Sequence, residues 1–288
     1  MTIKVTWLGC ASYVLNLDGT KLLFDPFFFR NEWSKPVVQT KREDVDEVKA
    51  VFLTHAHIDH VTDAAWYAEN QNAPVYTSDV GKQNMVNWCS GKIIDFKTYP
   101  IKLMAEPYAL TENGINNIHV IDWGEKIKIS EDLTVESIQS KHIRFDFDTI
   151  MARVKSKEFR RLLKPIAAIG RGLLAGTVFS YCTFYKNLKI VSSGSLCDKY
   201  PEILKKYAPI DVFLVPLAGA SAKHLAEKGG NMINALKPKV VIPLHWDDFF
   251  PPISRIENLE PFNQYMRENH PDIQILKLNV DEETLIKL

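Results

Sequence analysis

Apolar and polar residues alternate at the start of the chain, which is typical of strands with one buried face. Ile3, Val5 and Trp7 occupy every second position. Residues 9–12 read as a turn, and Asp18-Gly19 is a strong two-residue hairpin signal. The pattern therefore predicts strands over 3–8, 13–17 and 21–24.

Later segments show continuous apolar runs and helical spacing. The run from Val48 to Leu53, broken by one lysine, is typical of a short strand buried on both faces. Helices are predicted at 61–70 and 79–88, with a strand at 74–77 between them. Residues 92–104 fit strands and a loop. Antiparallel strands of a meander should follow at 118–121, 126–129 and 133–138. The remaining predicted elements are a hairpin (176–186 and 188–191), strands at 211–216, 240–245 and 274–278, and a helix near 261–269.

Residues 144–175 look like an insertion built around a basic helix. The helix region carries seven basic residues and one acidic residue. Phe159, Leu162 and Ile166 lie on one face of an amphipathic helix, and Pro165 should kink or restart it. Three interpretations stay open: a solvated basic face packed on the protein, a cap whose cations hold an anionic substrate, and a peripheral membrane contact. The candidate substrate-binding cations are Arg160, Arg161 and Lys164.

Three histidines and an aspartate follow the buried strand within six residues: His55, His57, Asp59 and His60. Imidazole and carboxylate are ligands that zinc and similar divalent metals prefer. His55 and His57, at alternate positions past a strand end, can turn toward one ion. Asp59 and His60 can face a second ion about 3.5–4 Å away, the spacing of two-metal sites. The cluster therefore predicts a metal site rather than a merely polar loop.

Length and composition indicate how many domains, which partners and which cellular compartment to expect. The chain has 288 residues, 46% of them apolar, and no Pro/Gly/Ser-rich linker, so we expect one domain over 1–288. Basic and acidic residues balance at 35 each, which gives no reason to expect a nucleic acid partner. Four cysteines without C-x-x-C spacing fit free thiols in a reducing compartment. The start of the chain lacks the apolar segment of a signal peptide, and no run of about 18 apolar residues predicts a transmembrane segment. We expect a cytoplasmic protein with a small-molecule substrate; a homo-oligomer is compatible with the sequence.

The H-x-H-x-D-H motif at 55–60, preceded by an apolar strand and a threonine, resembles the signature of the metallo-β-lactamase superfamily. Further landmarks follow in order over most of the chain. The resemblance implies an α/β fold, the four-layer αβ/βα sandwich, with metal ligands at strand ends. It also implies a supporting aspartate after the early strands and two later histidine ligands, matched here by Asp25, His142 and His245. In this family pattern the first ion is held by His55, His57 and His142. The second ion is held by Asp59, His60 and His245.

The chain departs from the commonest family pattern at Gly194-Ser195. Many relatives carry Gly-Asp there, and the aspartate bridges the two metals. True β-lactamases lack this aspartate too, so two ions stay compatible, with Zn²⁺ expected and Mn²⁺ or Fe²⁺ as alternatives. A degenerate second site would leave one ion. Asp198 lies three residues further on, and Cys197 is a weaker option as a ligand.

The implied reaction is hydrolysis. Two divalent ions lower the pKa of bound water to about 7 and polarise a scissile carbonyl or phosphoryl oxygen. Asp59 would be the catalytic residue, orienting the metal-bound hydroxide and relaying a proton. We expect a metallo-hydrolase that cleaves an ester, lactone or phosphodiester bond in a small anionic or amphiphilic substrate. The chain ending around His245-Trp246-Asp247 resembles the branch that includes ascorbate-6-phosphate lactonase.

Several alternatives stay open. Asp247 could orient a ligand imidazole or cap a turn, and His224 could touch substrate or be a surface histidine. A di-iron redox protein shares the fold but usually has glutamate where His57 stands. A non-catalytic binding protein with a degenerate second site has only Ser195 in its favour. An RNA-processing nuclease is less expected, because the chain has no basic arm.

Overall fold

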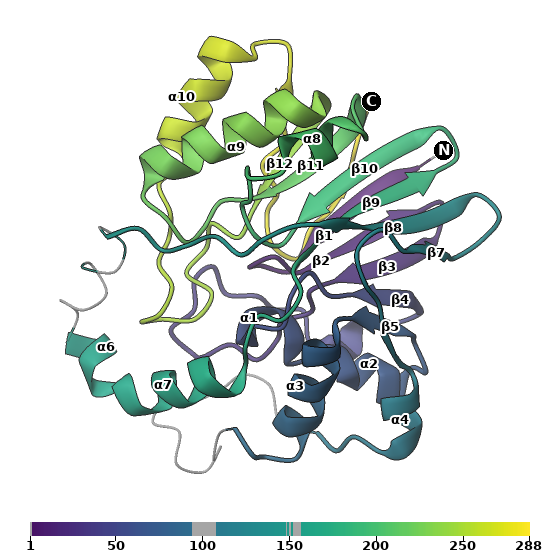
Figure 1. Cartoon of the computed structure of the whole chain (residues 1–288), viewed down its shortest axis with the longest axis vertical. Helices are drawn as coiled ribbons and strands as arrows, with labels where there is room; N and C mark the ends of the chain where they lie inside the picture. Colours follow the sequence, from purple (N-terminus) through teal and green to yellow (C-terminus); the bar gives the residue numbers. More distant parts are fainter. Residues whose placement is uncertain (1, 94–107, 148, 150, 152–156) are drawn as a thin grey trace.

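The computed structural model describes residues 2–93, 108–147, 149, 151 and 157–288 (Figure 1). Two seven-stranded sheets lie face to face, and helices cover their outer faces. In the first sheet the strand order is β14-β1-β2-β3-β4-β5-β6. In the second sheet it is β13-β12-β11-β10-β9-β8-β7.

The strands of the first sheet are β1 (Ile3–Trp7), β2 (Tyr13–Leu17), β3 (Thr20–Phe24), β4 (Val48–Phe52), β5 (Val75–Thr77), β6 (Ile118–Val120) and β14 (Glu283–Leu285). The strands of the second sheet are β7 (Lys126–Lys128), β8 (Leu133–Gln139), β9 (Phe179–Tyr185), β10 (Leu188–Ser193), β11 (Ile210–Pro216), β12 (Pro238–Leu244) and β13 (Gln274–Ile275). The helices are η1 (Arg42–Asp44), α1 (Ile58–Val61), α2 (Ala64–Asn70), α3 (Asp79–Cys89), α4 (Glu112–Asn116), α6 (Lys157–Arg161), α7 (Leu163–Gly172), α8 (Pro201–Lys205), α9 (Ala222–Leu236) and α10 (Glu260–Asn269).

Large apolar side chains from both sheets fill the space between them. The rings of Phe24 and Phe52 in the first sheet pack against Tyr181 in the second, with centroids 6.0 and 5.3 Å apart. Two further apolar layers join the first sheet to α2 and α3, and the second sheet to α9 and α10. Because helices and the partner sheet cover both of its faces, β11 is buried along its whole length. The architecture is the expected four-layer αβ/βα sandwich.

The parallel strands decide where a site can form. In the first sheet β3, β4, β5 and β6 run parallel, and in the second β10, β11 and β12 do. The carboxyl ends of neighbouring parallel strands meet at one edge of a sheet, where loops are free to carry functional side chains. The loops after β4 and β12 therefore open at such edges.

Two predicted elements differ in the structure. The helix expected at 61–70 is split into α1 and α2, and α1 begins earlier, at Ile58. The meander prediction is wrong for its first strand. β6 joins the first sheet, parallel to β5, whereas β7 and β8 pair antiparallel in the second. Strand periodicity identifies a strand but not the sheet that it joins. The edge strand β14 was not predicted, and most of 92–104 lies outside the described residues.

The insertion contains two helices where one kinked helix was predicted. α6 and α7 meet at Leu162, and Pro165 lies in the first turn of α7. The first N–H groups of a helix have no intrahelical acceptor, so proline is tolerated there. Phe27, Phe28 and Phe29 precede Arg30 in a loop, and all three are buried in the core. In the described part of the chain no helix is both long and apolar enough to cross a membrane.

Candidate metal centre

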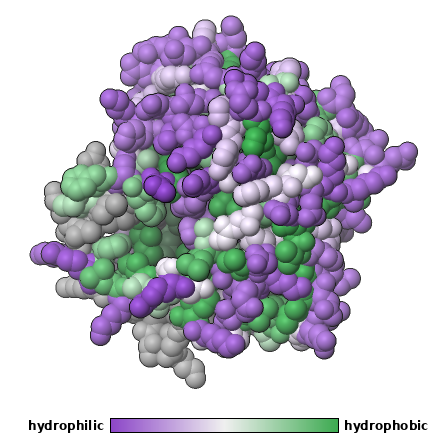
Figure 2. Space-filling model, in the orientation of Figure 1, coloured by the Kyte–Doolittle hydropathy of each residue, from purple (hydrophilic) through white to green (hydrophobic). Residues whose placement is uncertain are grey.

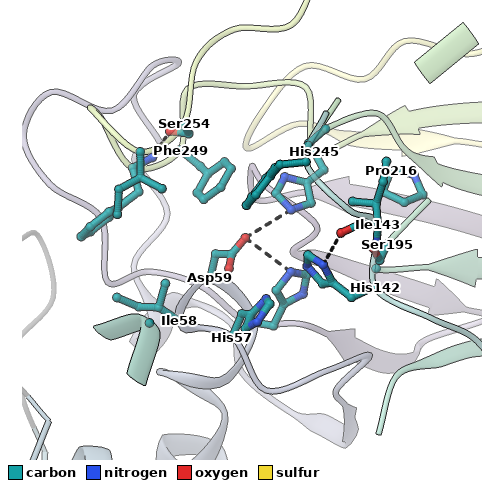
Figure 3. A pocket seen from close by; sticks show the side chains of 18 of the residues that line it. His57, Ile58, Asp59, His142, Ile143, Ser195, Pro216, His245, Phe249 and Ser254 are labelled. Atoms are coloured by element: carbon teal, nitrogen blue, oxygen red, sulfur yellow. Dashed lines mark hydrogen bonds and ion pairs between the residues drawn. The ribbon is translucent and has the colours of Figure 1, made fainter. Parts of the chain in front are cut away.

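The sequence-predicted ligands come together from three places in the fold. Four lie in the loop after β4 and in α1, one follows β8, and one directly follows β12. They are His55, His57, Asp59, His60, His142 and His245. Figure 3 shows His57, Asp59, His142 and His245 pointing into one pocket from the ends of both sheets.

His55, His57 and His142 form the first cluster. One nitrogen of each ring lies within 4.8 Å of the other two. Nδ1 of His142 donates to the carbonyl oxygen of Ile143 at 2.6 Å, which leaves Nε2 as an acceptor facing the cluster. Nε2 of His55 is buried and has no hydrogen-bond partner among the described residues. Three converging imidazoles with free lone pairs form a set that a divalent ion fits.

Burial keeps these imidazoles neutral. It lowers the pKa of His55 well below its usual value, and it lowers the pKa of His57 to about 4, helped by the neighbouring His142. The pKa of His142 is lowered for the same reason. Neutral imidazole is the form that binds metal.

Asp59 is the centre of the second cluster. Its Oδ2 lies 3.2 Å from Nε2 of His245 and 3.4 Å from Nε2 of His60. On the other side of the His60 ring, Nδ1 lies 3.0 Å from Oδ2 of Asp25. If Nδ1 donates to Asp25, then Nε2 is an acceptor that faces a carboxylate oxygen. Two acceptors in this position require a proton or a cation between them.

Without a metal, His60 itself carries the extra proton. Burial alone would lower the pKa of His60, but the charges of Asp25 and Asp59 raise it to about 10. Burial alone would raise the pKa of Asp59, but the charge of His60 and hydrogen bonding to His245 and His60 hold it well below its usual value. A divalent cation would replace this proton and satisfy the same acceptors, so the residues present fit a metal.

Sequence reasoning missed Cys10. Its sulfur, Asp59 and His245 form a second group whose ligand atoms lie within 4.8 Å of one another. The sequence assigned Cys10 only to a turn between β1 and β2. A usable signal was present, since Cys10 follows a strand end, the kind of position that supplies the other ligands. Cys197, the cysteine weighed instead, is buried and belongs to neither group in the described residues.

Asp25 contacts two residues of the ligand loop after β4. Besides facing His60, it accepts hydrogen bonds from the backbone N–H and the hydroxyl of Thr54, both at 2.7 Å. Its backbone is left-handed, with φ 43°, a conformation that aspartate tolerates better than most residues. Asp25 therefore fixes both the His60 ring and the residue before His55.

Ser195 does not reach between the two clusters. Its hydroxyl accepts from the backbone N–H of Ile143 at 2.9 Å, which holds the segment next to His142. Asp198 is turned toward α9, where it pairs with Lys228 at 3.0 Å and accepts from Asn231. Neither residue takes the place of the bridging aspartate.

The pocket above the clusters has mainly apolar walls and a volume of about 230 Å³. α7 covers one side, with Ile166, Ile169 and Leu173. Figure 2 shows the corresponding apolar hollow beside α7. Phe145, Leu196, Phe249 and Ile253 are further wall residues.

The insertion therefore caps the site with its apolar face, contrary to the idea of a basic lining. Arg160 and Lys164 are exposed and do not line the pocket, and the side chain of Arg161 lies outside what the structure describes. Hydrophobic spacing showed which helix face is apolar but not what that face covers.

His224 and Asp247 were each left with two alternatives by the sequence, and the structure places both side chains away from the ligand imidazoles of the described residues. The side chain of His224 is 51% exposed and pairs with Asp146 at 2.9 Å, away from the lining residues. Asp247 contacts no ligand imidazole. Its two oxygens accept from the backbone N–H of Cys10 at 2.9 and 3.0 Å, and Arg30 pairs with it at 3.2 Å.

Fold and site together define a metal-dependent α/β-sandwich enzyme, and comparison with known proteins agrees. A model of the β-lactamase superfamily domain matches residues 4–245, so the chain belongs to the metallo-β-lactamase superfamily. Over 253 residues it is 24% identical to a metal-dependent hydrolase of Pyrococcus abyssi, with 88% of each chain covered.

Solved structures share the fold. A metallo hydrolase from Ignicoccus hospitalis is similar with a TM-score of 0.64, 16% identity and 100% of both chains covered. The isothiocyanate hydrolase from Delia radicum gut bacteria is similar with a TM-score of 0.59, 17% identity and 98% of both chains covered. The protein is a metal-dependent hydrolase of this superfamily. Its relation to ascorbate-6-phosphate lactonase stays a prediction.

Proposed function

We propose that the protein is a dinuclear hydrolase that cleaves a carboxylic ester or lactone bond in a small amphiphilic substrate. The observation that carries the proposal is the pair of ligand clusters at the floor of a pocket with apolar walls. In this proposal, His55, His57 and His142 hold one divalent ion. Asp59, His60 and His245 hold the other.

We propose zinc at both positions, because zinc binds imidazole and carboxylate ligands well in compact sites. Manganese and iron are the alternatives. Divalent ions, when bound, lower the pKa of water and polarise the oxygen of the bond to be cleaved.

Asp59 is the residue that handles protons in this proposal. It lines the pocket, and its low pKa keeps it ionised near neutral pH. A carboxylate in this position can orient a water molecule and accept its proton. His142 donates to the carbonyl oxygen of Ile143, and the Ile143 N–H donates to Ser195, so this short chain of hydrogen bonds orients the His142 ring.

The walls support an apolar acyl or alkyl group on the substrate. Among the described lining residues the only Lys or Arg side chain is Arg255, and its Nε already lies 3.1 Å from a Glu257 oxygen. The two proposed ions could hold the phosphate of a phosphodiester at the reacting centre, but a phosphate remote from them, as in a sugar-phosphate lactone, would need a free cation in the walls to offset its charge. The amphiphilic substrate class therefore fits better than the anionic one.

The test combines metal analysis with a substrate series. Freshly purified protein should contain about two ions per chain, and His142→Ala should lose about one. His119→Ala, an exposed histidine on β6, should lose none. A series of esters of growing acyl chain length should show kcat/KM rising about fourfold per CH₂ until the pocket is full, from about 0.8 kcal/mol per buried CH₂.

Three results would contradict parts of the proposal. If the protein took up no metal, even after supplementation, the proposed metal-dependent mechanism of hydrolysis would be wrong. If phosphodiesters were turned over faster than esters, and acyl chain length had no effect, the proposed class of amphiphilic ester or lactone substrates would be wrong. Iron with oxygen-dependent redox turnover would favour the di-iron alternative.

A further inference from the structure

Cys10 lies against the second cluster with its side chain fully buried. Its Sγ is 3.5 Å from Oδ2 of Asp59. It is also 3.6 Å from Nε2 of His245 and 3.5 Å from Nδ1 of the same ring. The sulfur therefore faces the two side chains that would hold the second ion.

The sulfur of Cys10, Oδ2 of Asp59 and Nε2 of His245 are close enough together for one ion to contact all three. Their separations are 3.6 Å for Cys10 to His245, 3.5 Å for Cys10 to Asp59 and 3.2 Å for Asp59 to His245, and ligands of one zinc ion lie about 3.4–3.6 Å apart when the Zn–S bond is about 2.3 Å and the Zn–N and Zn–O bonds are about 2.1 Å. Because Nδ1 of His245 is as close to the sulfur as Nε2 is, the imidazole ring has to turn for one nitrogen to point at the ion. His60 contacts this group at Asp59, 3.4 Å away.

The backbone around Cys10 is held in place by the other ligand loop. The N–H of His245 donates to the carbonyl oxygen of Cys10 at 2.9 Å, and the indole of Trp7 donates to the same oxygen at 2.9 Å. Asp247 accepts from the Cys10 N–H. Cys10 and His245 both have left-handed backbones, with φ 52° and 60°, which cysteine adopts rarely. Such strain persists only where the surroundings fix it, and it gathers at functional sites.

We propose that Cys10 is a thiolate ligand of the second ion, together with Asp59, His60 and His245. This inference rests on the proposed dinuclear function. On binding, the S–H bond breaks, a sulfur–metal bond forms and the proton passes to solvent. Cys10 thereby occupies a place that the missing bridging aspartate leaves open, and it does so from a turn near the start of the chain.

Two consequences follow for the site. With four protein ligands, the second ion would have no free coordination position. The ion held by the three imidazoles of the first cluster would keep a fourth coordination position open to substrate or water. A thiolate also makes the second position selective, because soft sulfur favours zinc over magnesium, calcium and manganese.

Cobalt substitution tests this directly. The metal-free protein is loaded with Co²⁺, and its near-ultraviolet absorption is recorded beside metal content. A thiolate bound to Co²⁺ gives a charge-transfer band that imidazole and carboxylate ligands do not give. We expect the band in the wild type, its loss in Cys10→Ser, and its retention in Cys182→Ser, a buried cysteine of β9 outside both clusters.

The outcomes separate this inference from the proposed function. Two Co²⁺ ions per chain without the band in the wild type would overturn the role of Cys10 and leave the dinuclear hydrolase intact. A band that persists in Cys10→Ser would assign the thiolate to another cysteine and would also overturn it. No cobalt or zinc uptake by the wild type would overturn both. If Cys10→Ser does not fold, a wild-type spectrum without the band still overturns the inference, and a band that survives in Cys89→Ser, Cys182→Ser and Cys197→Ser leaves Cys10 as its source among the four cysteines.

Discussion

The carboxylate of Asp25 lies 3.0 Å from Nδ1 of His60, on the side of the ring opposite to Asp59. This contact orients the imidazole and raises its basicity as a ligand. Asp25 also fixes Thr54, directly before His55, so one buried carboxylate supports both clusters.

Replacing Asp25 should therefore weaken metal binding without removing a ligand. We expect Asp25→Ala to lower the affinity for metal about 10–100-fold, the usual effect of losing such a partner. Competition with a chelator of known affinity measures it. Asp272→Asn, at an exposed position, is the matched control. An unchanged affinity in Asp25→Ala would show that the His60 ring is oriented by packing alone.

The apolar face of α7 should set the preference for substrate. Ile166→Glu puts a charge into the pocket wall, so turnover of long-chain esters should fall and the dependence on chain length should flatten. Ala167→Glu places the same charge on the exposed side of the same helix and should leave kinetics unchanged. Steady-state kinetics over the ester series compares the two. Equal effects would mean that α7 does not contact the substrate.

Close packing at Gly194 should make it intolerant of a side chain. A Cβ at this position would collide with the Thr54 side chain, the partner of Asp25. We expect Gly194→Ala to lose about 1–3 kcal/mol of unfolding free energy, typical of overpacking, and to weaken metal binding. Urea unfolding and chelator competition measure the two effects.

Gly170→Ala is the control for that substitution, because no described residue lies within 4 Å of its added Cβ in α7. It should stabilise the protein by about 0.5–1 kcal/mol through helix propensity. If Gly194→Ala matched it, the space beside Thr54 would have to open at little cost.

Asp146 should make stability depend on pH. Burial alone would raise its pKa, but hydrogen bonds from Thr149, His224 and Ser221 lower it below the usual value. The contacts are short, 2.9 Å from Thr149 N–H and 2.7 Å from Ser221 N–H. A carboxylate with a lowered pKa contributes stability that is present above its unfolded value of about 4 and is lost as pH falls through the folded value.

We therefore expect the unfolding free energy of the wild type to decrease as the pH is lowered below about 4. Asp146→Asn should be about 1–3 kcal/mol less stable at neutral pH, and its unfolding free energy should depend less on pH in the acid range. Urea unfolding at a series of pH values measures this. Asp132→Asn, an exposed aspartate, should follow the wild type. If the unfolding free energies of wild type and Asp146→Asn decreased equally with falling pH, the acid sensitivity would come from other carboxylates.

The sequence pointed to the site residues that lie close together in the chain and to those that follow predicted strands. His55 to His60 form a dense motif after a buried strand, and the family resemblance pointed to His142 and His245, which follow predicted strands. It could not predict Cys10, because that contact joins two turns 235 residues apart. It also could not place the apolar face of α7 over the site, since periodicity carries no information about the partner of a face.

The hydrogen bond between the His245 N–H and the Cys10 carbonyl has a consequence for biogenesis. The ribosome makes Cys10 long before it makes His245, with 235 positions between them. The second cluster therefore does not exist while the first sheet is emerging, even though Asp59 and His60 are already present. If the site is dinuclear as proposed, the second ion can be loaded only after β12 and the residue following it have been translated.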